Sequence, residues 1–443
     1  MEENANPGYF RKIGLLSASG IVVANMIGAG IFTTSGLLMS GLGNPVILIL
    51  LWVVGGIVAL CGAMAYAELG KAMPRAGGEY VFLSQLYHPL SGFLSGWVSF
   101  IVGFSAPIAA SAIGFSEYLH RAFPGFQVSN SLLSITVICV FTLIHLRGIQ
   151  FGAIVQNGLT LVKVSIIILI VMTGLFWGKG STGHFTSGST FQWSFGNVKT
   201  LGLSLMWIMF AYSGWNASTY IGSEILHPKR NIPRSLLLGT GMVMLLYLML
   251  NFVYVYAIEP AAMKGVISIG GLAMRNMFGS NMEVAFSLMI AFALFSSLSA
   301  FIMLGPRVYY AMAADGYFFR FLARVHPRFG VPSAAIIMQA LLSILMVISG
   351  SFDQILTYMG FSLGFFPILA VAGVIKLRKT QQDRSAFHGF PVYITGFLSF
   401  SVIMMILSYF ERPMESSIAI LTILSGLPVY FYFKRQKQLI GKV

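Results

Sequence analysis

The stretch NMIGAGIF, residues 25–32, decides the fold. It lies in a run without formal charge from Ile13 to Ala67, which is long enough for two membrane-spanning helices because each needs about 20 apolar residues. Gly28 and Gly30 fall near the middle of the first helix, where each costs about 1 kcal/mol of helix preference relative to alanine. The sequence therefore predicts a first span that is broken inside the membrane.

A second interruption lies five spans further along the chain. The stretch FAYSGWN, residues 210–216, places Ser213, Gly214 and Asn216 at an equivalent depth in the sixth apolar segment. Interrupted helices at corresponding positions are typical of inverted repeats, whose breaks meet at the bilayer midplane and form a substrate site. Close helix packing through small residues is the alternative explanation for the glycine pair, but the matched second break favours a binding site.

The composition excludes a cytosolic globular enzyme. Only 9% of the 443 residues are charged and 57% are hydrophobic, whereas soluble proteins carry about 25% charged residues. We therefore expect an all-α membrane protein with twelve transmembrane helices and no large soluble domain. The predicted spans are 14–38, 45–69, 90–117, 130–147, 153–177, 201–222, 235–258, 284–313, 333–350, 354–375, 389–410 and 416–433.

The net charge of +14 is an orientation signal and does not indicate nucleic-acid binding, because the charges punctuate apolar runs. With the N-terminus inside, 20 of the 27 Lys and Arg residues are cytoplasmic. Lys163 lies within the fifth span, and six residues are outside: Arg121, Lys179, Lys199, Lys264, Arg275 and Arg412. The sequence predicts a multi-pass protein of the cell membrane with both termini in the cytoplasm.

An interrupted helix exposes amide N–H groups at the start of one half and carbonyl groups at the end of the other. Amides around Gly28, Ala29 and Gly30 can bind a carboxylate, with help from the helix dipole. Carbonyls near Val23, Ala24, Phe210 and Ala211 can accept hydrogen bonds from an ammonium group. This pair of ends matches a zwitterionic α-amino acid.

Several motifs in order resemble a known family. The stretches GAGIF (28–32), AELG (67–70) and PRAGGEY (74–80) resemble the amino acid, polyamine and organocation transporter superfamily. The motifs VQN (155–157) with Lys163, FAYSGWN (210–216) followed by Glu224, PKRNIPR (228–234) and RVYYAMAADG (307–316) are similar to its L-type amino acid transporter branch. The resemblance implies a single transporter domain over 1–443 with a five-plus-five inverted repeat, 13–177 and 201–376, and two further helices in 389–433.

The resemblance also implies roles for residues at the two breaks. It would place the substrate carboxylate on Ala29 and Gly30 and the amino group on carbonyls near Phe210. Phe210 would be an aromatic gate and Asn216 a polar pocket or gating residue, although packing and an interhelical hydrogen bond are the respective alternatives. The full predicted substrate-binding set is Ile27, Gly28, Ala29, Gly30, Phe210, Ala211, Ser213 and Asn216.

Lys163 is predicted to be a coupling residue. It lies about ten residues into the fifth span, about 15 Å of helix from the cytoplasmic end, where an unpaired lysine costs at least about 2.5 kcal/mol. In the resembled branch a lysine of this span supplies a positive charge close to the position that Na⁺ occupies in sodium-coupled proteins of the fold. Transport would then need no sodium. A purely stabilising lysine, neutralised by carbonyls, is the alternative.

The leading function is secondary transport of neutral L-amino acids by exchange or proton coupling. Neutral substrates are expected because no acid lies near the midplane of spans 1, 3, 6, 8 or 10; transport of cationic amino acids or polyamines is the alternative. An intramembrane enzyme or a channel is less favoured, since the chain contains no HExxH and its Gly-x-Ser-x-Gly match, residues 360–364, lies inside the apolar predicted span 354–375 rather than at a strand-to-helix turn. No cofactor or metal is expected, because the seven His residues have no metal-ligand spacing.

The expected partners are an amino acid substrate and the lipid bilayer. The stretch HRAFPGFQ, residues 120–127, contains no cysteine, so no disulfide-linked heavy chain is expected; the oligomeric state is open, with a monomer as one possibility. At the cytoplasmic end an inner gate of ion pairs is one hypothesis, and simple obedience to the positive-inside rule is the other. The residues concerned are Glu68, Arg75, Glu79, Arg230, Arg234, Arg307 and Asp315.

Overall fold

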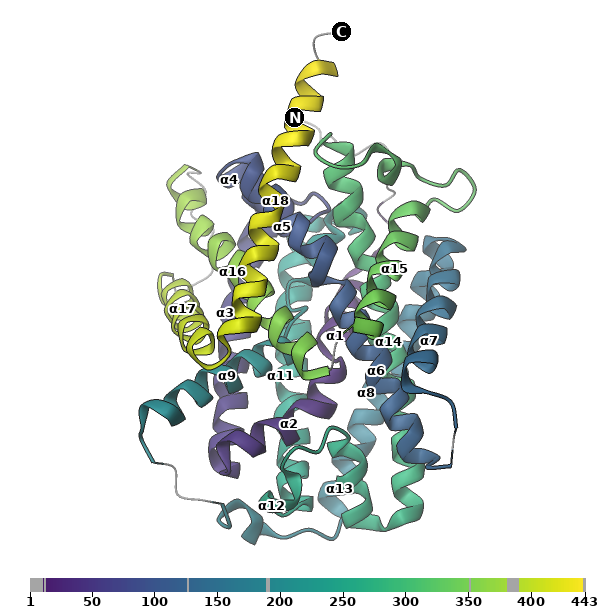
Figure 1. Ribbon diagram of the computed structural model, residues 1–443, viewed down its shortest axis with the longest axis vertical. Helices are drawn as coiled ribbons and strands as arrows, with labels where there is room; N and C mark the ends of the chain where they lie inside the picture. The colour runs from purple at the N-terminus through teal and green to yellow at the C-terminus, as the bar shows by residue number, and fades with distance from the viewer. Residues whose placement is uncertain are drawn as a thin grey trace.

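The computed structural model describes residues 11, 13–125, 127–188, 192–349, 352–380 and 390–440. Within these ranges the chain forms helices and no strand, apart from one isolated bridge between Ile13 and Ile225. Figure 1 shows a bundle of helices running along its long axis. Both termini of the chain lie outside the described residues. So does residue 389, at which the predicted segment 389–433 begins.

Nine helical segments in the described chain are long and apolar enough to cross a membrane. Two of them consist of several pieces: α1 (Leu15–Met26) with α2 (Ala29–Leu42), and α5 (Pro89–Val98) with the π-helical turn η1 (Ser99–Gly103) and α6 (Ser105–Ala122). The others are α3 (Pro45–Ala72), α8 (Ile149–Phe176), α11 (Pro228–Ala257), α14 (Ser280–Ala314), α16 (Phe352–Thr380), α17 (Val392–Glu411) and α18 (Pro413–Ile440).

Three shorter apolar helices occupy the remaining predicted spans: α7 (Asn130–Leu146), α9 (Phe195–Ala211) and α15 (Ser333–Ser349). The other elements are α4 (Glu79–Leu86), α10 (Ala217–Tyr220), α12 (Pro260–Met263), α13 (Ile269–Phe278), η2 (Thr182–Phe185), η3 (Gly222–Glu224) and η4 (Arg320–Ala323). The charged start of α11 lies before the predicted span 235–258, and the charged end of α18 lies beyond the predicted span 416–433.

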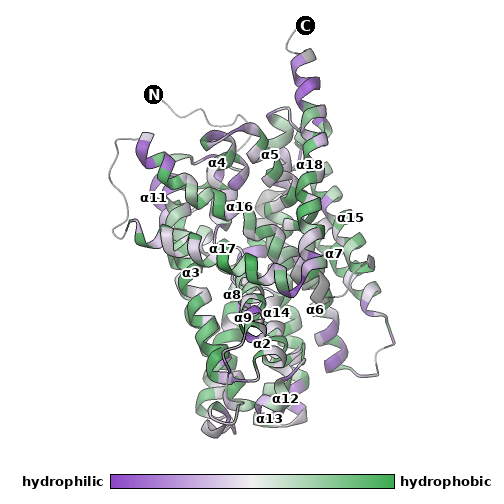
Figure 2. Cartoon of the chain, turned by 60° about the vertical axis from the view of Figure 1, so that its left-hand side comes forward, coloured by the Kyte–Doolittle hydropathy of each residue, from purple (hydrophilic) through white to green (hydrophobic). Residues whose placement is uncertain are grey.

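The surface of the bundle is suited to lipid. Large apolar side chains are exposed along the long helices, for example Leu161 at 70%, Leu245 at 55% and Leu50 at 56%. Figure 2 shows hydrophobic residues along the middle of the helices and hydrophilic ones towards their ends, clearly so at the free end of α18. So broad an apolar surface would aggregate in water and is stable in a bilayer.

Both predicted interruptions are present. Helix α1 ends at Met26, and α2 starts at Ala29 without a side-chain cap. Helix α9 ends at Ala211, and the chain regains helical form at Ala217 after a turn in which Gly214 has φ +96°. That positive φ is readily adopted only by glycine, which explains the residue type at this break.

A third irregularity was not predicted from the sequence. The third span contains the π-helical turn η1, in which the Phe104 amide donates to the Ser99 carbonyl at 3.3 Å. Single π-helical turns inside helices are often found at functional sites. This turn places Ser99 and Gly103 against the cavity described below.

Candidate functional site

The two interrupted helices contact each other directly. A Cβ atom on Gly30 would lie 2.7 Å from the Cα of Ala211 and 3.3 Å from the ring of Phe210, and one on Gly214 would lie 2.8 Å from the carbonyl carbon of Asn25. Real Cβ atoms do not approach so closely. Glycine at both positions therefore allows the backbones of the two breaks to meet.

Tyr247 of α11 joins the two breaks. Its hydroxyl oxygen lies 2.5 Å from the carbonyl oxygen of Met26 and 2.9 Å from that of Ala211, the last residues of α1 and α9. The side chain is fully buried, so this hydroxyl provides a donor for carbonyls that the interruption leaves unpaired. Sequence reasoning missed Tyr247, because an interior tyrosine in a span has no local signature.

The first turn of α2 offers free donors. The amides of Ala29 and Gly30 precede the first intrahelical hydrogen bond of α2, and no acceptor for them occurs among the hydrogen bonds of the described residues. Such amides, together with the positive end of the helix dipole, attract a carboxylate.

The four predicted acceptor carbonyls each already accept one hydrogen bond. The donors are the Ile27 amide for Val23, Lys163 for Ala24, the Ser213 amide for Phe210 and Tyr247 for Ala211. A carbonyl has two lone pairs, so an ammonium group would be a second donor to the Phe210 carbonyl.

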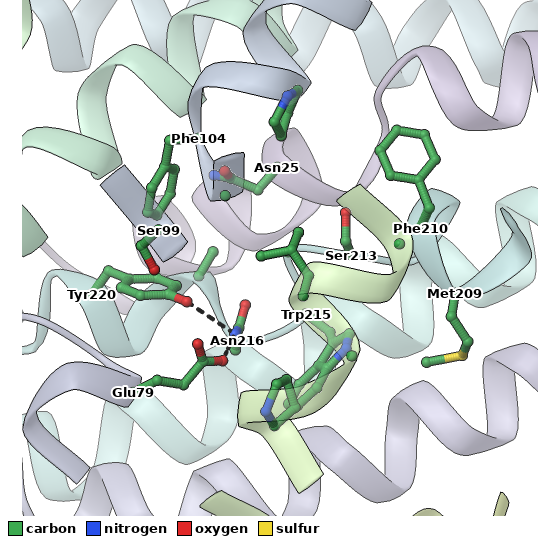
Figure 3. Close-up of a pocket in the computed structure, with 18 of the residues that line it drawn as sticks. Asn25, Glu79, Ser99, Phe104, Met209, Phe210, Ser213, Trp215, Asn216 and Tyr220 are labelled. Atoms are coloured by element: carbon green, nitrogen blue, oxygen red, sulfur yellow. Dashed lines mark hydrogen bonds between the residues drawn. The ribbon is translucent and has the colours of Figure 1, made fainter. Parts of the chain in front are cut away.

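A cavity of about 100 Å³ lies beside the breaks. It is lined by residues from the first, third, sixth, eighth, tenth and eleventh apolar segments, among them Asn25, Phe104, Trp215 and Tyr220 (Figure 3). Three predicted site residues line it: Phe210, Ser213 and Asn216. Ile27, Gly28, Ala29, Gly30 and Ala211 are not part of this lining, and Gly30 lies behind Phe210 and Ala211.

Lys163 lies deep in the bundle and away from the cavity lining. Its side chain is 0% exposed, and Nζ donates to the carbonyls of Ala24 at 3.0 Å and Ile27 at 2.5 Å and to Ser297 Oγ at 2.8 Å. Ser297, on α14, donates to the Ile27 carbonyl as well. The ammonium thus joins α8, the interrupted first span and α14.

Glu79 is a cavity residue that sequence reasoning did not place there. It is the first residue of α4, between the second and third spans, and is 5% exposed. Its Oε1 accepts a hydrogen bond from Tyr66 at 2.7 Å. The same oxygen accepts from Asn216 at 2.8 Å, and Asn216 also donates to Tyr220 (Figure 3). Burial raises the pKa of the Glu79 carboxyl, while these hydrogen bonds act to lower it.

The argument for a neutral substrate covered acids near the midplane of spans 1, 3, 6, 8 and 10, and Glu79 lies outside all of them, on α4. Gly77 (φ +122°) and Gly78 (φ +54°) turn the chain so that α4 folds back against the bundle. A Cβ on Gly78 would lie 2.5 Å from the ring of Tyr220. The glycine pair in AGGEY was the available signal, but a loop residue cannot be placed in a cavity from sequence spacing alone.

The residues predicted for an inner gate form several ion pairs. Arg75 pairs with Asp315 at 2.6 Å and Arg307 with Glu224 at 2.7 Å, while Arg378 pairs with Glu68 at 2.5 Å. Tyr80 also donates to Asp315 at 2.8 Å. Arg230 and Arg234 are exposed on the first turns of α11. The pairs connect the segment after α3 with the end of α14, η3 with α14, and α3 with α16, at one end of the bundle.

These features define the class of protein: a polytopic membrane protein with two interrupted helices that meet beside a small buried cavity. Its described residues contain no group of three or more His, Cys, Asp or Glu able to hold a metal ion. The chain belongs to the amino acid permease family, whose model matches residues 13–431.

Similar proteins are amino acid transporters by name. The chain is 27% identical over 431 residues to the cystine/glutamate transporter of Homo sapiens, covering 96% of this chain and 85% of the relative. It is 28% identical over 431 residues to the large neutral amino acids transporter small subunit 2 of Mus musculus, covering 95% and 80%. It is 27% identical over 440 residues to the b(0,+)-type amino acid transporter 1 of Mus musculus, covering 96% and 88%.

Proposed function

We propose that this protein is a secondary transporter of amino acids that works by alternating access around the two interrupted helices. The contact between Gly30 and Ala211 carries the proposal, because it brings the free amides of α2 next to the carbonyl end of α9. One end suits a carboxylate and the other an ammonium group. Membership of the amino acid permease family supports the same substrate class.

The fold that goes with this function has twelve membrane-crossing helices. The nine long segments and three shorter apolar helices of the described chain supply that number. We assign 13–177 and 201–376 to two inverted repeats, each with its interrupted helix first, and 389–433 to two additional helices, all in one transporter domain. Alternating access then consists of movement of the interrupted helices relative to their neighbours.

In the proposed complex, the amides of Ala29 and Gly30 hold the substrate carboxylate and the Phe210 carbonyl receives the amino group. The substrate side chain extends into the cavity beside Ser213 and Asn216. Phe210, which touches both Gly30 and the cavity, covers the bound amino acid and acts as the gate.

Lys163 replaces a sodium ion in this proposal. Its ammonium contacts two carbonyls of the interrupted first span and one hydroxyl of α14, an oxygen set of the kind that a small cation would otherwise occupy. A positive charge there makes transport independent of Na⁺.

The protein is placed in the cell membrane with both termini in the cytoplasm and without a disulfide-linked heavy chain. The distribution of Lys and Arg supports this orientation. Cysteine is absent from residues 120–127, so a purified single chain is expected to transport.

A second candidate, transport of cationic amino acids, is favoured by one observation, the Glu79 carboxylate in the cavity lining. A competition experiment with unlabelled amino acids distinguishes a transporter of neutral amino acids from one of cationic amino acids. Leucine, alanine and serine are expected to displace a bound neutral amino acid from the purified chain at lower concentrations than arginine or lysine. Displacement by arginine or lysine at lower concentration would favour the second candidate, and no displacement by any amino acid would contradict both.

A further inference from the structure

Glu79 differs from the other acids at its end of the bundle. Glu68, Glu224 and Asp315 each have an arginine within 4.0 Å. Among the described residues no Lys, Arg or His nitrogen lies within that distance of Glu79. A buried carboxylate without a cation is costly, so this group needs either a ligand or a proton to balance it.

The groups facing Glu79 are titratable only at high pH. They are the phenols of Tyr66 on α3 and Tyr220 on α10, with the neutral amide of Asn216 between them. Helix α5, which packs against α4, carries no charged residue. On α16, Lys376 binds the Leu86 carbonyl at the far end of α4, and Arg378 is paired with Glu68. Glu79 is therefore the group in this cluster that can gain or lose a proton while the phenols keep theirs.

We propose that Glu79 binds a proton that is transported together with the amino acid, so that the protein is a proton–amino acid symporter. This inference rests on the proposed transport function and adds the coupling ion and its site. Glu79 lines the same cavity as Phe210 and Asn216, so a proton and a substrate reach their sites from the same side of the membrane.

The hydrogen bonds of Glu79 connect protonation to movement of the interrupted sixth span. When ionised, the carboxylate accepts from Tyr66 on α3 and from Asn216, which precedes α10, and so holds α10 against α3 and α4. Hydrogen bonds to a charged acceptor are roughly twice as strong as neutral ones. Protonation weakens both bonds and frees α10 to move, after which the proton is released on the opposite side together with the substrate.

Lys163 is less suited to this task. Its ammonium has three acceptors, it is 0% exposed, and it is not part of the cavity lining. The Glu79 carboxyl lines the cavity, has no cation within 4.0 Å in the part of the chain that the structure describes, and has its pKa raised by burial. The acid therefore exchanges protons during transport, because it lines the cavity and the lysine does not.

The test measures proton and amino acid movement in the same vesicles. The purified full-length chain is reconstituted in proteoliposomes with a pH-sensitive dye in the lumen, and radiolabelled leucine, alanine or serine is added outside. In the wild type, uptake should acidify the lumen in fixed proportion to the amino acid taken up. Glu79→Gln should reduce protons moved per amino acid to the level of protein-free vesicles, and Glu117→Gln, at the other end of the third span, should retain the wild-type ratio.

Tyr66→Phe gives a second readout that a purely structural role would not produce. The Tyr66 hydroxyl favours the ionised form of Glu79, so its removal should raise the pKa of Glu79 and move the midpoint of the pH–uptake profile to higher pH. Wild-type uptake without proton movement, an unchanged ratio in Glu79→Gln, or an unshifted profile in Tyr66→Phe would each overturn the inference. Failure of the wild type to exchange labelled for unlabelled amino acid would instead contradict the proposed transport function.

Discussion

Gly30 is the residue at which the two breaks are most tightly fitted. Because an added Cβ would lie 2.7 Å from Ala211 Cα, even Gly30→Ala should push the interrupted helices apart, at a cost of about 1–3 kcal/mol for overpacking. Amino acid affinity should fall by about ten-fold, the equivalent of about 1.4 kcal/mol. Substrate-induced thermal stabilisation in detergent measures this effect.

Gly241→Ala is the matched control, because a Cβ at this helical position of α11 meets nothing within 4 Å. It should bind substrate like the wild type. Equal affinities of the Gly30→Ala and Gly241→Ala variants would remove the first break from the binding site.

Lys163 gives a second prediction at the scale of the residue. Lys163→Ala leaves the Ala24 carbonyl without a donor, at a cost of about 1–3 kcal/mol, and leaves the Ile27 carbonyl with the Ser297 hydroxyl as its remaining side-chain donor. These groups hold the first break, so uptake should fall by about ten-fold or more while the yield of monodisperse protein falls far less. Lys264→Ala, on an exposed loop, is the control. Uptake and yield that fall in parallel would show that Lys163 is only structural.

Single residues could be predicted from sequence where their chemistry conflicts with their surroundings. Glycines in the middle of a span and a lysine deep in the membrane are such conflicts, and Lys163 indeed contacts the break that Gly28 and Gly30 indicated. Tyr247 and Glu79 could not be found in this way. A tyrosine suits a helix and a glutamate suits a loop, and their roles arise only from contacts with residues distant in sequence.

At the scale of elements, the hydrophobicity of the sequence predicted where the spans lie. It did not predict the π-helical turn within one of them. Predicted span 45–69 corresponds to α3 at Pro45–Ala72, and 333–350 corresponds to α15 at Ser333–Ser349. The π-helical turn at Ser99–Gly103 was missed, because its residues are compatible with an ordinary helix.

The ion pairs between elements should differ in strength because they differ in burial. Arg307 and Glu224 are 6% and 3% exposed, whereas Arg75 and Asp315 are 36% and 29% exposed. Glu224→Gln should therefore destabilise the protein by about 3–5 kcal/mol by leaving a buried charge without its carboxylate. Asp315→Asn should cost about 0–1 kcal/mol. Thermal unfolding in detergent measures both.

Asp315→Asn should instead alter the transport rate, since Asp315 ties α14 to Arg75 and Tyr80 beside α4. Equal destabilisation by the two substitutions would contradict this division between a stabilising pair and an adjustable one.

At the scale of the whole molecule, composition and charge predicted a bundle within a bilayer, and the family match agrees with it. The substrate could be predicted only as a class. Carboxylate and ammonium recognition follows from the backbone at the breaks, but the shape of the cavity depends on side chains from six different segments. Sequence alone does not place these side chains relative to one another.

Counterflow in proteoliposomes tests the central claim of amino acid transport around the two breaks most directly. Vesicles containing the chain purified alone are loaded with unlabelled amino acid, diluted into labelled amino acid, and assayed with Na⁺ replaced by choline. We predict accumulation of label in choline as in Na⁺, without any second subunit, and weaker accumulation in Gly30→Ala but not in Gly241→Ala. Absence of accumulation for every common amino acid in the wild type, or accumulation only with Na⁺, would contradict this result.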